Sequence, residues 1–394
     1  MNATLDDRAR DYDAVLVVSF GGPEGPDDVE PFLDRVLRGL PITPESRRRV
    51  ARRYEAFGGV SPINAQTRAF IAALQQELDS RGPALPIYWG NRNWHPLLVD
   101  AVEQMAHDGV RRAIAYVTSA FSSYSGCRKY REDLYEAVSA VPNAPEIDKL
   151  RVAFNHPGFI AAVCDRTRDA FAALPAARRA QAPILFTAHS LPESMARHCR
   201  YEAQLAEACQ LVGDALEHQR WQLVYQSNNA TYGREKWLGP DIAEALRAVR
   251  DEGADDVVVV PIGFVCDHME VVLDLDVEAA AVASGVGLNM VRAGTVGTHP
   301  AYVAAVRELI VERLSAHPVR RALGTLGPSH DVCPVDCCLS GRPGPPKPAL
   351  CGVDSPPVPR ASAAPARPAG ATAAEARPES RPRKAVVPGG EGGA

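Results

Sequence analysis

Short apolar segments recur along the chain, and their spacing limits the fold more than any other feature of the sequence. Each holds four to eight mostly apolar residues rich in Val and Ile, a pattern typical of strands that are buried on both faces. Helical patterns lie between them, and one begins with Ser61 as N-cap and Pro62 at the first position and stops at Gly82. This alternation predicts parallel sheets built from βαβ units. The apolar segments are residues 14–20, 85–90, 112–119, 149–154, 183–190, 222–227, 256–264 and 288–297.

The apolar segments form two sets of four, separated by a helical pattern at residues 157–174. We therefore expect an α/β protein with two similar Rossmann-like domains, each with a four-stranded parallel sheet flanked by helices. Beyond about residue 340 the chain holds mostly Pro, Ala, Gly and Arg, which predicts disorder. The expected domains are residues 1–155, residues 156–325, a cysteine-containing segment at 326–340 and a disordered tail at 341–394.

Composition excludes several functional classes. The 394 residues carry a net charge of −5, and the absence of a basic field argues against a nucleic-acid partner. No apolar run reaches the length of a membrane span, and the polar, acidic start MNATLDDRARDYD does not resemble a signal peptide. We therefore expect a cytoplasmic protein. In a reducing compartment its nine cysteines are buried fillers or metal ligands rather than disulfides.

A row of acidic residues follows the seventh apolar segment, in the sequence GFVCDHMEVVLDLDVE at residues 263–278. In a helix that starts near Asp267, the carboxylates of Glu270, Asp274 and Glu278 share one face, because these residues are spaced four apart. Like charges at this spacing repel, and a hard metal cation passing along the face would offset the repulsion. The alternative is an acidic first turn favoured by the helix dipole, followed by a solvated stripe.

Two other strand ends carry unusual residues, and ligands of open parallel sheets bind beyond such ends. Gly21 and Gly22 in SFGGPEGPDD permit a tight turn and close approach of a ligand to the backbone. Neither a Walker motif nor G-x-G-x-x-G is present there, which argues against a nucleotide. His189 ends the fifth segment, where it is either a partly buried or capping histidine or a functional one. If it faces the acidic row across one cleft, the two groups can take protons and bind a metal ion.

Several longer motifs stand in order along residues 13–320. They are SFGGP (19–23), RRYEAFGGVSPIN (52–64), TSAFSSYSGCRKY (118–130), TAHSLP (187–192), YQSNNATYGREKWLGPD (225–241) and GFVCDHMEVVLDLDVE (263–278). In this order and separation they resemble the ferrochelatases, enzymes of the lyase class that insert Fe(II) into a porphyrin. The resemblance implies the chelatase fold, with two similar four-stranded parallel sheets around a cleft.

The resemblance also implies roles for individual residues. His189 and Glu270 would bind Fe(II) and accept the pyrrole protons. Asp274 and Glu278 would form an acidic line from Glu270 toward solvent, on a helix with a π-type distortion. The residues that match the family's porphyrin pocket are Arg53, Tyr54, Ser61 and Tyr130.

Differences between this sequence and the motifs of other family members indicate which porphyrin is the expected substrate. Phe20 stands where some members carry a Tyr, so no oxygen ligand comes from that position. YWGNRNW and SSYSGC resemble the actinobacterial subgroup, which favours coproporphyrin III as substrate and Fe-coproporphyrin III, a haem precursor, as product. The alternatives are protoporphyrin IX as substrate, a cobaltochelatase of the same fold, or a porphyrin or haem carrier without chemistry. Later haem-pathway enzymes are expected partners.

Arginines gather in LPITPESRRRVARRYEAFGG, where membrane-bound members carry an apolar lip, so we expect no stable membrane association. They would suit the four propionates of a tetrapyrrole, unless they form only a solvated basic helix face. The arginines are Arg47, Arg48, Arg49, Arg52 and Arg53.

Three cysteines lie within six residues in DVCPVDCC, at residues 331–338. Some members of the family carry a [2Fe–2S] cluster held by one internal cysteine and three near the C-terminus. The resemblance therefore implies Cys164, Cys333, Cys337 and Cys338 as its ligands, with Cys351 as a rival for one place. The alternatives are a redox-sensitive thiol group or adventitious zinc. The sequence assigns no function to Cys127, Cys199, Cys209 and Cys266.

Overall fold

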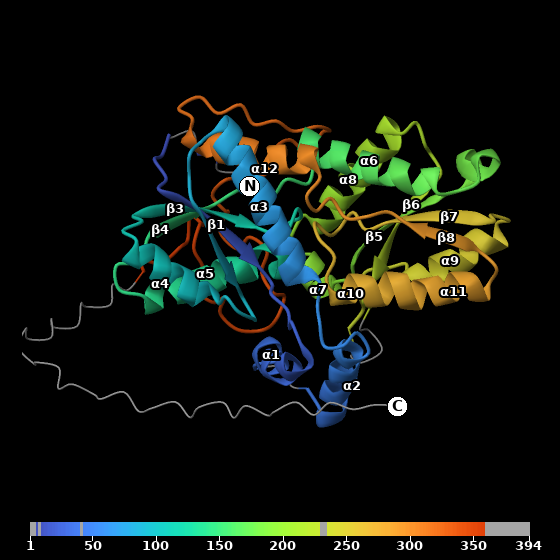
Figure 1. The fold of residues 1–394 in the computed structure, drawn as a ribbon, viewed down its shortest axis with the longest axis horizontal. Coiled ribbons are helices and arrows are strands. Elements are labelled where there is room, and N and C mark those ends of the chain that lie inside the picture. The colour runs from blue at the N-terminus through green and yellow to red at the C-terminus, as the bar shows by residue number, and fades with distance from the viewer. Residues whose placement is uncertain (1–4, 7–8, 40–41, 229–234, 359–394) are drawn as a thin grey trace, which may run out of the picture. The chain divides into compact units, whose positions relative to one another are not determined.

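The computed structural model, in which residues 5–6, 9–39, 42–228 and 235–358 are described, contains two parallel sheets of four strands each (Figure 1). The first sheet has the order β2-β1-β3-β4, and the second repeats it as β6-β5-β7-β8. The predicted fold, with two similar halves, is therefore confirmed. The strands are β1 Ala14–Ser19, β2 Ile87–Asn91, β3 Arg112–Val117, β4 Glu146–Lys149, β5 Ile184–His189, β6 Trp221–Gln226, β7 Asp256–Val260 and β8 Asn289–Arg292.

Helices connect the strands and cover both faces of each sheet (Figure 1). The α-helices are α1 Val29–Val36, α2 Pro44–Glu55, α3 Ile63–Arg81, α4 Leu98–His107, α5 Lys129–Ala140, α6 Pro157–Ala172, α7 Glu193–Ala196, α8 Tyr201–Ala215, α9 Ile242–Asp251, α10 Met269–Val271, α11 Ala280–Gly285 and α12 Pro300–Leu314. The 3-10 helices are η1 Pro26–Asp28 and η3 Ala176–Gln181, and the π-helices are η2 Tyr124–Arg128 and η5 Val272–Ala279.

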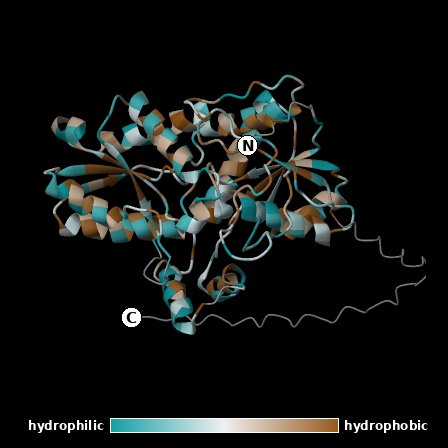
Figure 2. Cartoon of the chain, turned by 180° about the vertical axis from the view of Figure 1, so that it is seen from behind, coloured by the Kyte–Doolittle hydropathy of each residue, from teal (hydrophilic) through white to brown (hydrophobic). Residues whose placement is uncertain are grey.

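Alternate residues of β1 face two different cores, which explains its unbroken apolar run. Val15 and Val17 pack with α3 and α12, whereas Leu16 and Val18 pack with α4 and α5. The first of these cores continues through α6 and α8 to β5, so it joins the two halves. In Figure 1, α6, α8 and α12 accordingly lie above the strands. Figure 2 shows hydrophobic and hydrophilic stripes side by side on the helices, as expected of helices that cover a sheet.

The boundary predicted at residue 155 separates the two sheets along the sequence. It does not separate two hydrophobic cores, because one core contains residues of both halves. The hydroxyl groups of Tyr116 in β3 and Tyr302 in α12 lie 2.5 Å apart within this core. The domain boundaries themselves stay a prediction.

Two elements differ locally from the sequence prediction. The fourth strand covers Glu146–Lys149 instead of residues 149–154, because the chain leaves the sheet at Leu150 while its side chains stay buried. Val152 and Phe154 pack in the core that joins the halves, so their apolar character reflects burial without strand pairing. Helix α3 has Pro62 as its N-cap instead of Ser61, and it ends at Gly82, whose φ of +68° favours glycine.

The segment after α12 packs against the folded part far beyond the point where we expected disorder. Ala349 and Leu350 are buried, and the Leu350 amide donates to the Arg131 carbonyl oxygen at 3.1 Å. The prediction of disorder is therefore wrong for residues 341–358, where the backbone is irregular but placed by α5. The remainder of the predicted tail, residues 359–394, lies outside the described residues.

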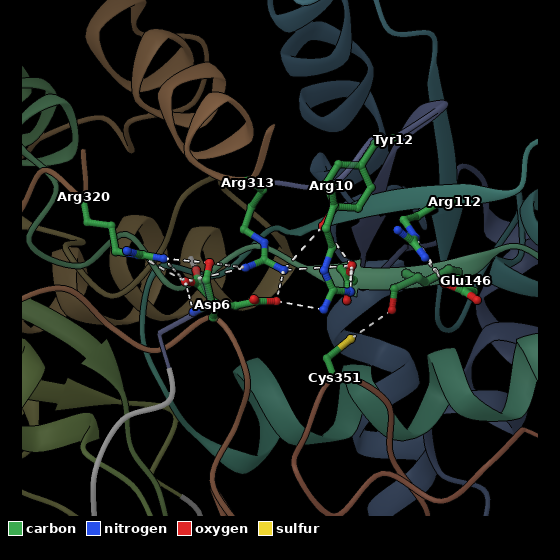
Figure 3. A network of polar contacts seen from close by, with 11 residues as sticks. Asp6, Arg10, Tyr12, Arg112, Glu146, Arg313, Arg320 and Cys351 are labelled. Carbon is green, nitrogen blue, oxygen red and sulfur yellow. Dashed lines mark hydrogen bonds and ion pairs between the residues drawn. The ribbon is translucent and has the colours of Figure 1, made fainter. Parts of the chain in front are cut away.

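A buried polar network ties the N-terminal residues to α12 and to the C-terminal segment (Figure 3). Arg313 of α12 is 3% exposed, and its guanidinium lies 3.3 Å from Asp6 and 3.6 Å from Asp331. Arg320 binds the same Asp331 carboxylate at 2.9 Å, and Arg10 binds Asp6 at 2.8 Å. In the described part of the chain, no helix is both long and apolar enough to cross a membrane.

The ion pair between Arg151 and Glu312 gives a test of how the halves are joined. Both side chains are buried, and the guanidinium makes two hydrogen bonds of 2.7 and 2.8 Å to the carboxylate. We expect Arg151→Met to lower the free energy of unfolding by about 3–5 kcal/mol, because it leaves a buried carboxylate unpaired. Urea denaturation followed by circular dichroism measures this change.

Two controls separate the buried pair from a general loss of charge. Arg250→Met breaks an exposed pair with Asp255 and should cost less than about 1 kcal/mol. The double variant Arg151→Met with Glu312→Leu should recover most of the lost stability, because no charge stays buried. Equal losses in Arg151→Met and Arg250→Met would contradict the prediction.

Candidate functional site

The end of β5 and the start of α10 bring the predicted histidine and glutamate together. The Nε2 atom of His189, the last residue of β5, lies 3.5 Å from the Oε2 atom of Glu270. The two residues are more than eighty positions apart in the sequence, and the second sheet positions both, since α10 and η5 follow β7 directly. The His189 side chain is 30% exposed and that of Glu270 53% exposed, so solvent reaches the pair.

A second contact fixes which nitrogen of His189 carries a proton. Its Nδ1 atom lies 2.6 Å from the carbonyl oxygen of Ser190. A carbonyl oxygen only accepts hydrogen bonds, so Nδ1 must donate, and the neutral imidazole presents its lone pair at Nε2. That lone pair faces Glu270, where it can accept a proton or bind a metal ion.

The two groups shift each other's protonation. Burial alone would lower the pKa of His189, but the adjacent Glu270 carboxylate outweighs it and raises the imidazole pKa above its ordinary 6.5. Burial would raise the pKa of Glu270, yet the imidazole of His189 lowers it to about 2. Each group therefore favours the charged form of the other, and a metal ion that binds the pair must compete with a proton at His189 Nε2.

The acidic row lies on a π-helix, as the resemblance implies. Asp274 and Glu278 belong to η5, whose widened turns bring residues four apart closer to register than an α-helix does. Asp274 is 7% exposed and accepts hydrogen bonds from the Ser227 hydroxyl and, at 3.4 Å, from the Gln226 amide. Burial, together with the charges of Glu270 and Glu278, raises the pKa of Asp274 to about 6. It can therefore gain or lose a proton near neutral pH.

Helix α2 of the first half reaches the acidic row of the second half. An Arg53 guanidinium nitrogen lies 4.0 Å from the Glu278 carboxylate. Burial and then the charge of Glu270 raise the pKa of Tyr54, which places this ring near the His189–Glu270 pair. Arg53 is 43% exposed, so the contact marks proximity and contributes little stability.

Ser61 and Tyr130 are placed less directly. Ser61 is 4% exposed and its amide donates to the Pro23 carbonyl oxygen at 2.8 Å. Tyr130 is 5% exposed and packs in the core of the first half. Their roles in binding a porphyrin stay predictions.

The glycines after β1 serve the packing of the chain. Gly21 has a φ of +76°, and a Cβ there would lie 2.8 Å from the Asn91 side chain. A Cβ on Gly22 would lie 2.6 Å from that of Ser61. The space that we expected a ligand to use is therefore filled by β2 and by the loop before α3.

Sequence reasoning missed two residues: Arg92, beside the predicted pocket residue Tyr130, and His268, beside Glu270. Arg92 lies with its guanidinium 5.5 Å from the ring centre of Phe20 and 4.7 Å from that of Tyr130, and it pairs with Asp133 at 2.5 Å. His268 caps α10 by accepting from the Val271 amide at 3.4 Å, and so helps to place Glu270. A buried arginine between rings follows no periodic pattern, and histidine is not among the usual N-cap residues.

The basic stretch in α2 does not act as one group. Arg47 pairs with Glu30 and Asp34 of α1 at 2.5 and 2.7 Å, so it docks one helix on the other. Arg48, Arg52 and Arg53 are the exposed members of the stretch.

Five cysteines pack together in one group, in which Cys127, Cys333 and Cys338 are buried and Cys337 and Cys199 partly buried. Hydrogen bonds between thiols link Cys127, Cys333, Cys337 and Cys338, which we call the thiol cluster. The Cys199 thiol instead donates to the Ala196 carbonyl oxygen at 3.3 Å. The Sγ atoms of Cys337 and Cys338 are 3.4 Å apart, and His330 Nε2 lies 3.6 Å from Cys337 Sγ. The left-handed φ angle of 58° at Cys338 gives the tight bend that two adjacent ligands need. Hydrogen bonds among the four thiols lower the pKa values of Cys127 and Cys337 and raise those of Cys333 and Cys338, so the metal-free group favours thiolates at Cys127 and Cys337.

The internal cysteine of this group is Cys127, in η2, whereas Cys164, the predicted internal ligand, lies outside the group. Cys164 lies in α6, where it packs in the core that joins the halves, and burial raises its pKa to about 11. Cys351 lies beside the group, but its thiol donates to the Ile147 carbonyl oxygen at 3.3 Å (Figure 3). Both cysteines therefore behave as buried thiols.

Comparison with known proteins agrees with the motifs. A sequence model of the ferrochelatase family matches residues 12–314. A ferrochelatase of Rhodopirellula baltica is 51% identical to the chain, over 83% of this chain and 93% of that protein. A coproporphyrin III ferrochelatase of Streptomyces griseus is 47% identical, over 88% of this chain and 97% of that protein.

A solved structure supports the fold alone. SirB from Bacillus subtilis, solved with Fe3+, matches with a TM-score of 0.50 over 77% of this chain and 95% of that protein. The sequence identity of that match is 12%.

The charge pairing at the site predicts a pKa change in one variant. Glu270→Gln removes the negative charge that favours the imidazolium but leaves the burial, so the pKa of His189 should fall below its wild-type value. NMR titration of the imidazole C2 proton in the metal-free protein measures it. Metal binding competes with this proton. The pH above which the metal ion binds should therefore be lower in Glu270→Gln than in the wild-type protein.

Glu278→Gln is the matched control, because it makes the same change on η5 without touching the His189–Glu270 contact. The pKa of His189 should change far less in that variant. An unchanged pKa of His189 in Glu270→Gln would refute the pairing.

Proposed function

Because the chain belongs to the ferrochelatase family, we propose that it inserts Fe(II) into coproporphyrin III, giving Fe-coproporphyrin III for haem synthesis. The observation that carries the proposal is the 3.5 Å approach of His189 Nε2 to Glu270, with the Nδ1 proton committed to Ser190. A nitrogen lone pair and a carboxylate that face each other suit both a divalent metal ion and a proton.

Metal insertion needs groups that take two protons, because a free-base porphyrin carries two N–H groups and its metal complex carries none. Neutral His189 accepts a proton at Nε2 and Glu270 lies beside it. Asp274, with a pKa of about 6, is suited to pass protons onward along η5 near neutral pH. Glu278, which is 56% exposed, would deliver them to solvent.

The choice of coproporphyrin III rests on the relatives and on charge. The Streptomyces griseus relative carries that substrate in its name, and Arg48, Arg52 and Arg53 expose positive charge on α2 near the site. Four propionates gain more from such charge than the two of protoporphyrin IX. A cobaltochelatase or a carrier remains the alternative, but a carrier has no use for the metal-binding pair.

The thiol cluster fits a [2Fe–2S] cluster, which takes four cysteine thiolates. We propose Cys127, Cys333, Cys337 and Cys338 as its ligands. Such a cluster would supply one-electron chemistry and would link η2 to the C-terminal segment. The rival is a zinc ion, because ligand atoms of His330, Cys333 and Cys337 all lie within 4.8 Å of one another.

The remaining expectations from the sequence belong to this proposal. They are the lyase class, a cytoplasmic location, no nucleic-acid partner, no stable membrane association and contact with later haem-pathway enzymes.

One competition experiment tests the activity and the substrate together. With Fe(II) and equal amounts of coproporphyrin III and protoporphyrin IX, we expect Fe-coproporphyrin III as the main product, measured by chromatography. His189→Ala should abolish insertion and still bind the porphyrin, measured by absorbance, because only the metal and proton site is lost. Near-full turnover by His189→Ala would exclude the proposed chemistry, and Fe-protoporphyrin IX as main product would exclude the substrate.

Matched cysteine variants test the iron–sulfur proposal. Purified protein should be brown and contain two iron and two sulfide ions per chain, the content of a [2Fe–2S] cluster. Cys127→Ser should lose the colour and the sulfide, whereas Cys164→Ser should keep both, because only Cys127 lies in the thiol cluster. Zinc without sulfide in the wild-type protein, or colour retained in Cys127→Ser, would contradict this assignment.

A further inference from the structure

Two buried cations lie beside the thiol cluster without a carboxylate partner. Arg131 in α5 is fully buried, and Lys149 at the end of β4 is 4% exposed. Lys149 donates to the Leu150 carbonyl oxygen at 2.7 Å, and Arg131 donates from Nε to that of Leu350. The two terminal nitrogens of Arg131 have no hydrogen-bond partner, and neither residue forms an ion pair with any carboxylate in the described ranges.

The backbone is shaped to hold the Arg131 guanidinium next to the cysteines. Arg131 follows Cys127 by one helical turn, because η2 continues directly into α5. Gly352, which pairs with Cys333 in a parallel bridge, leaves the space that this guanidinium occupies. A Cβ at Gly352 would lie only 2.2 Å from Arg131 Nη2.

Lys149 approaches the same group from the sheet, where it lines one small cavity together with Gly126, the residue before Cys127. Burial would lower the pKa of Lys149, but the charge of the neighbouring thiol group, that of Cys127 most, outweighs it and raises the pKa above its ordinary value. The Arg131 charge opposes that of Lys149, so the two cations also repel each other. Arg128 differs from both, because its guanidinium lies 3.6 Å from the Glu132 carboxylate.

A buried charge is costly unless an opposite charge lies beside it. Two neighbouring buried cations without carboxylates therefore require an anionic neighbour, and the thiol cluster is the group they share. Cys351 does not supply that charge, because burial raises the pKa of its thiol to about 11.

We propose that Arg131 and Lys149 are the counter-charges of the metal-bound thiol cluster and set its reduction potential. The inference rests on the proposed iron–sulfur function. Four thiolates and a core of two Fe(III) and two sulfide ions carry a net charge of −2, which the two cations balance. Uptake of one electron from an external reductant makes the charge −3, so each cation favours the reduced form.

Redox titration of the purified holoprotein with dithionite, followed by electron paramagnetic resonance, tests the inference. Lys149→Met should make reduction at least tenfold less favourable, about 59 mV lower in midpoint potential for one electron. Lys236→Met removes the same charge at a side chain that is 82% exposed and should leave the midpoint unchanged. Gly352→Ala keeps both charges but displaces the Arg131 guanidinium, so it should also lower the midpoint.

The possible outcomes separate the inference from the function on which it rests. If Lys149→Met loses the cluster, Lys149→Arg should retain it, because the charge is restored. An unchanged midpoint in Lys149→Met, or loss of the cluster from both the Met and the Arg variants, would overturn the inference. Wild-type protein without iron and sulfide would instead overturn the iron–sulfur proposal itself.

Discussion

The hydrogen bond from the His189 ring to the Ser190 carbonyl oxygen governs the chemistry of the site. It commits Nδ1 as a donor, so the only nitrogen left for a proton or a metal ion is the one that faces Glu270. Without it the imidazole could adopt the other tautomer, and Nε2 would carry a proton where a lone pair is required. The pairing of β5 with β6 and β7 holds this residue at the carboxyl edge of the second sheet, beside the helix that follows β7.

The two halves have the same architecture, but they contribute different kinds of residues to the candidate site. The second half holds the residues that we propose for metal and proton binding, at the end of β5 and in α10 and η5. The first half supplies aromatic rings and arginines, from α2, β2 and α5. The core shared by α3, α6, α8 and α12 fixes the positions of these two sets of residues relative to each other. The contact between Arg53 and Glu278 shows how closely the two sets approach.

The sequence predicted the sheets well because buried parallel strands leave continuous apolar runs, as in β1 and β7. The fourth strand was misplaced because Val152 and Phe154 are buried by the neighbouring half after the chain has left the sheet. Motif and spacing both indicated His189 and Glu270, and the structure brings these two side chains to within 3.5 Å of each other. Cys127 was missed because helical periodicity does not say which buried cysteine a distant C-terminal segment will meet, and Arg92 because its partners are two rings from separate elements.

The family match ends at residue 314, while three of the four clustered thiols lie after it. This segment contacts η2, α5 and the turn after α7, and its Asp331 lies 3.6 Å from Arg313 of α12. Deleting the segment would remove the Leu350 carbonyl oxygen that accepts from Arg131 and three of the four clustered thiols, so the buried Arg131 guanidinium would lose its surroundings.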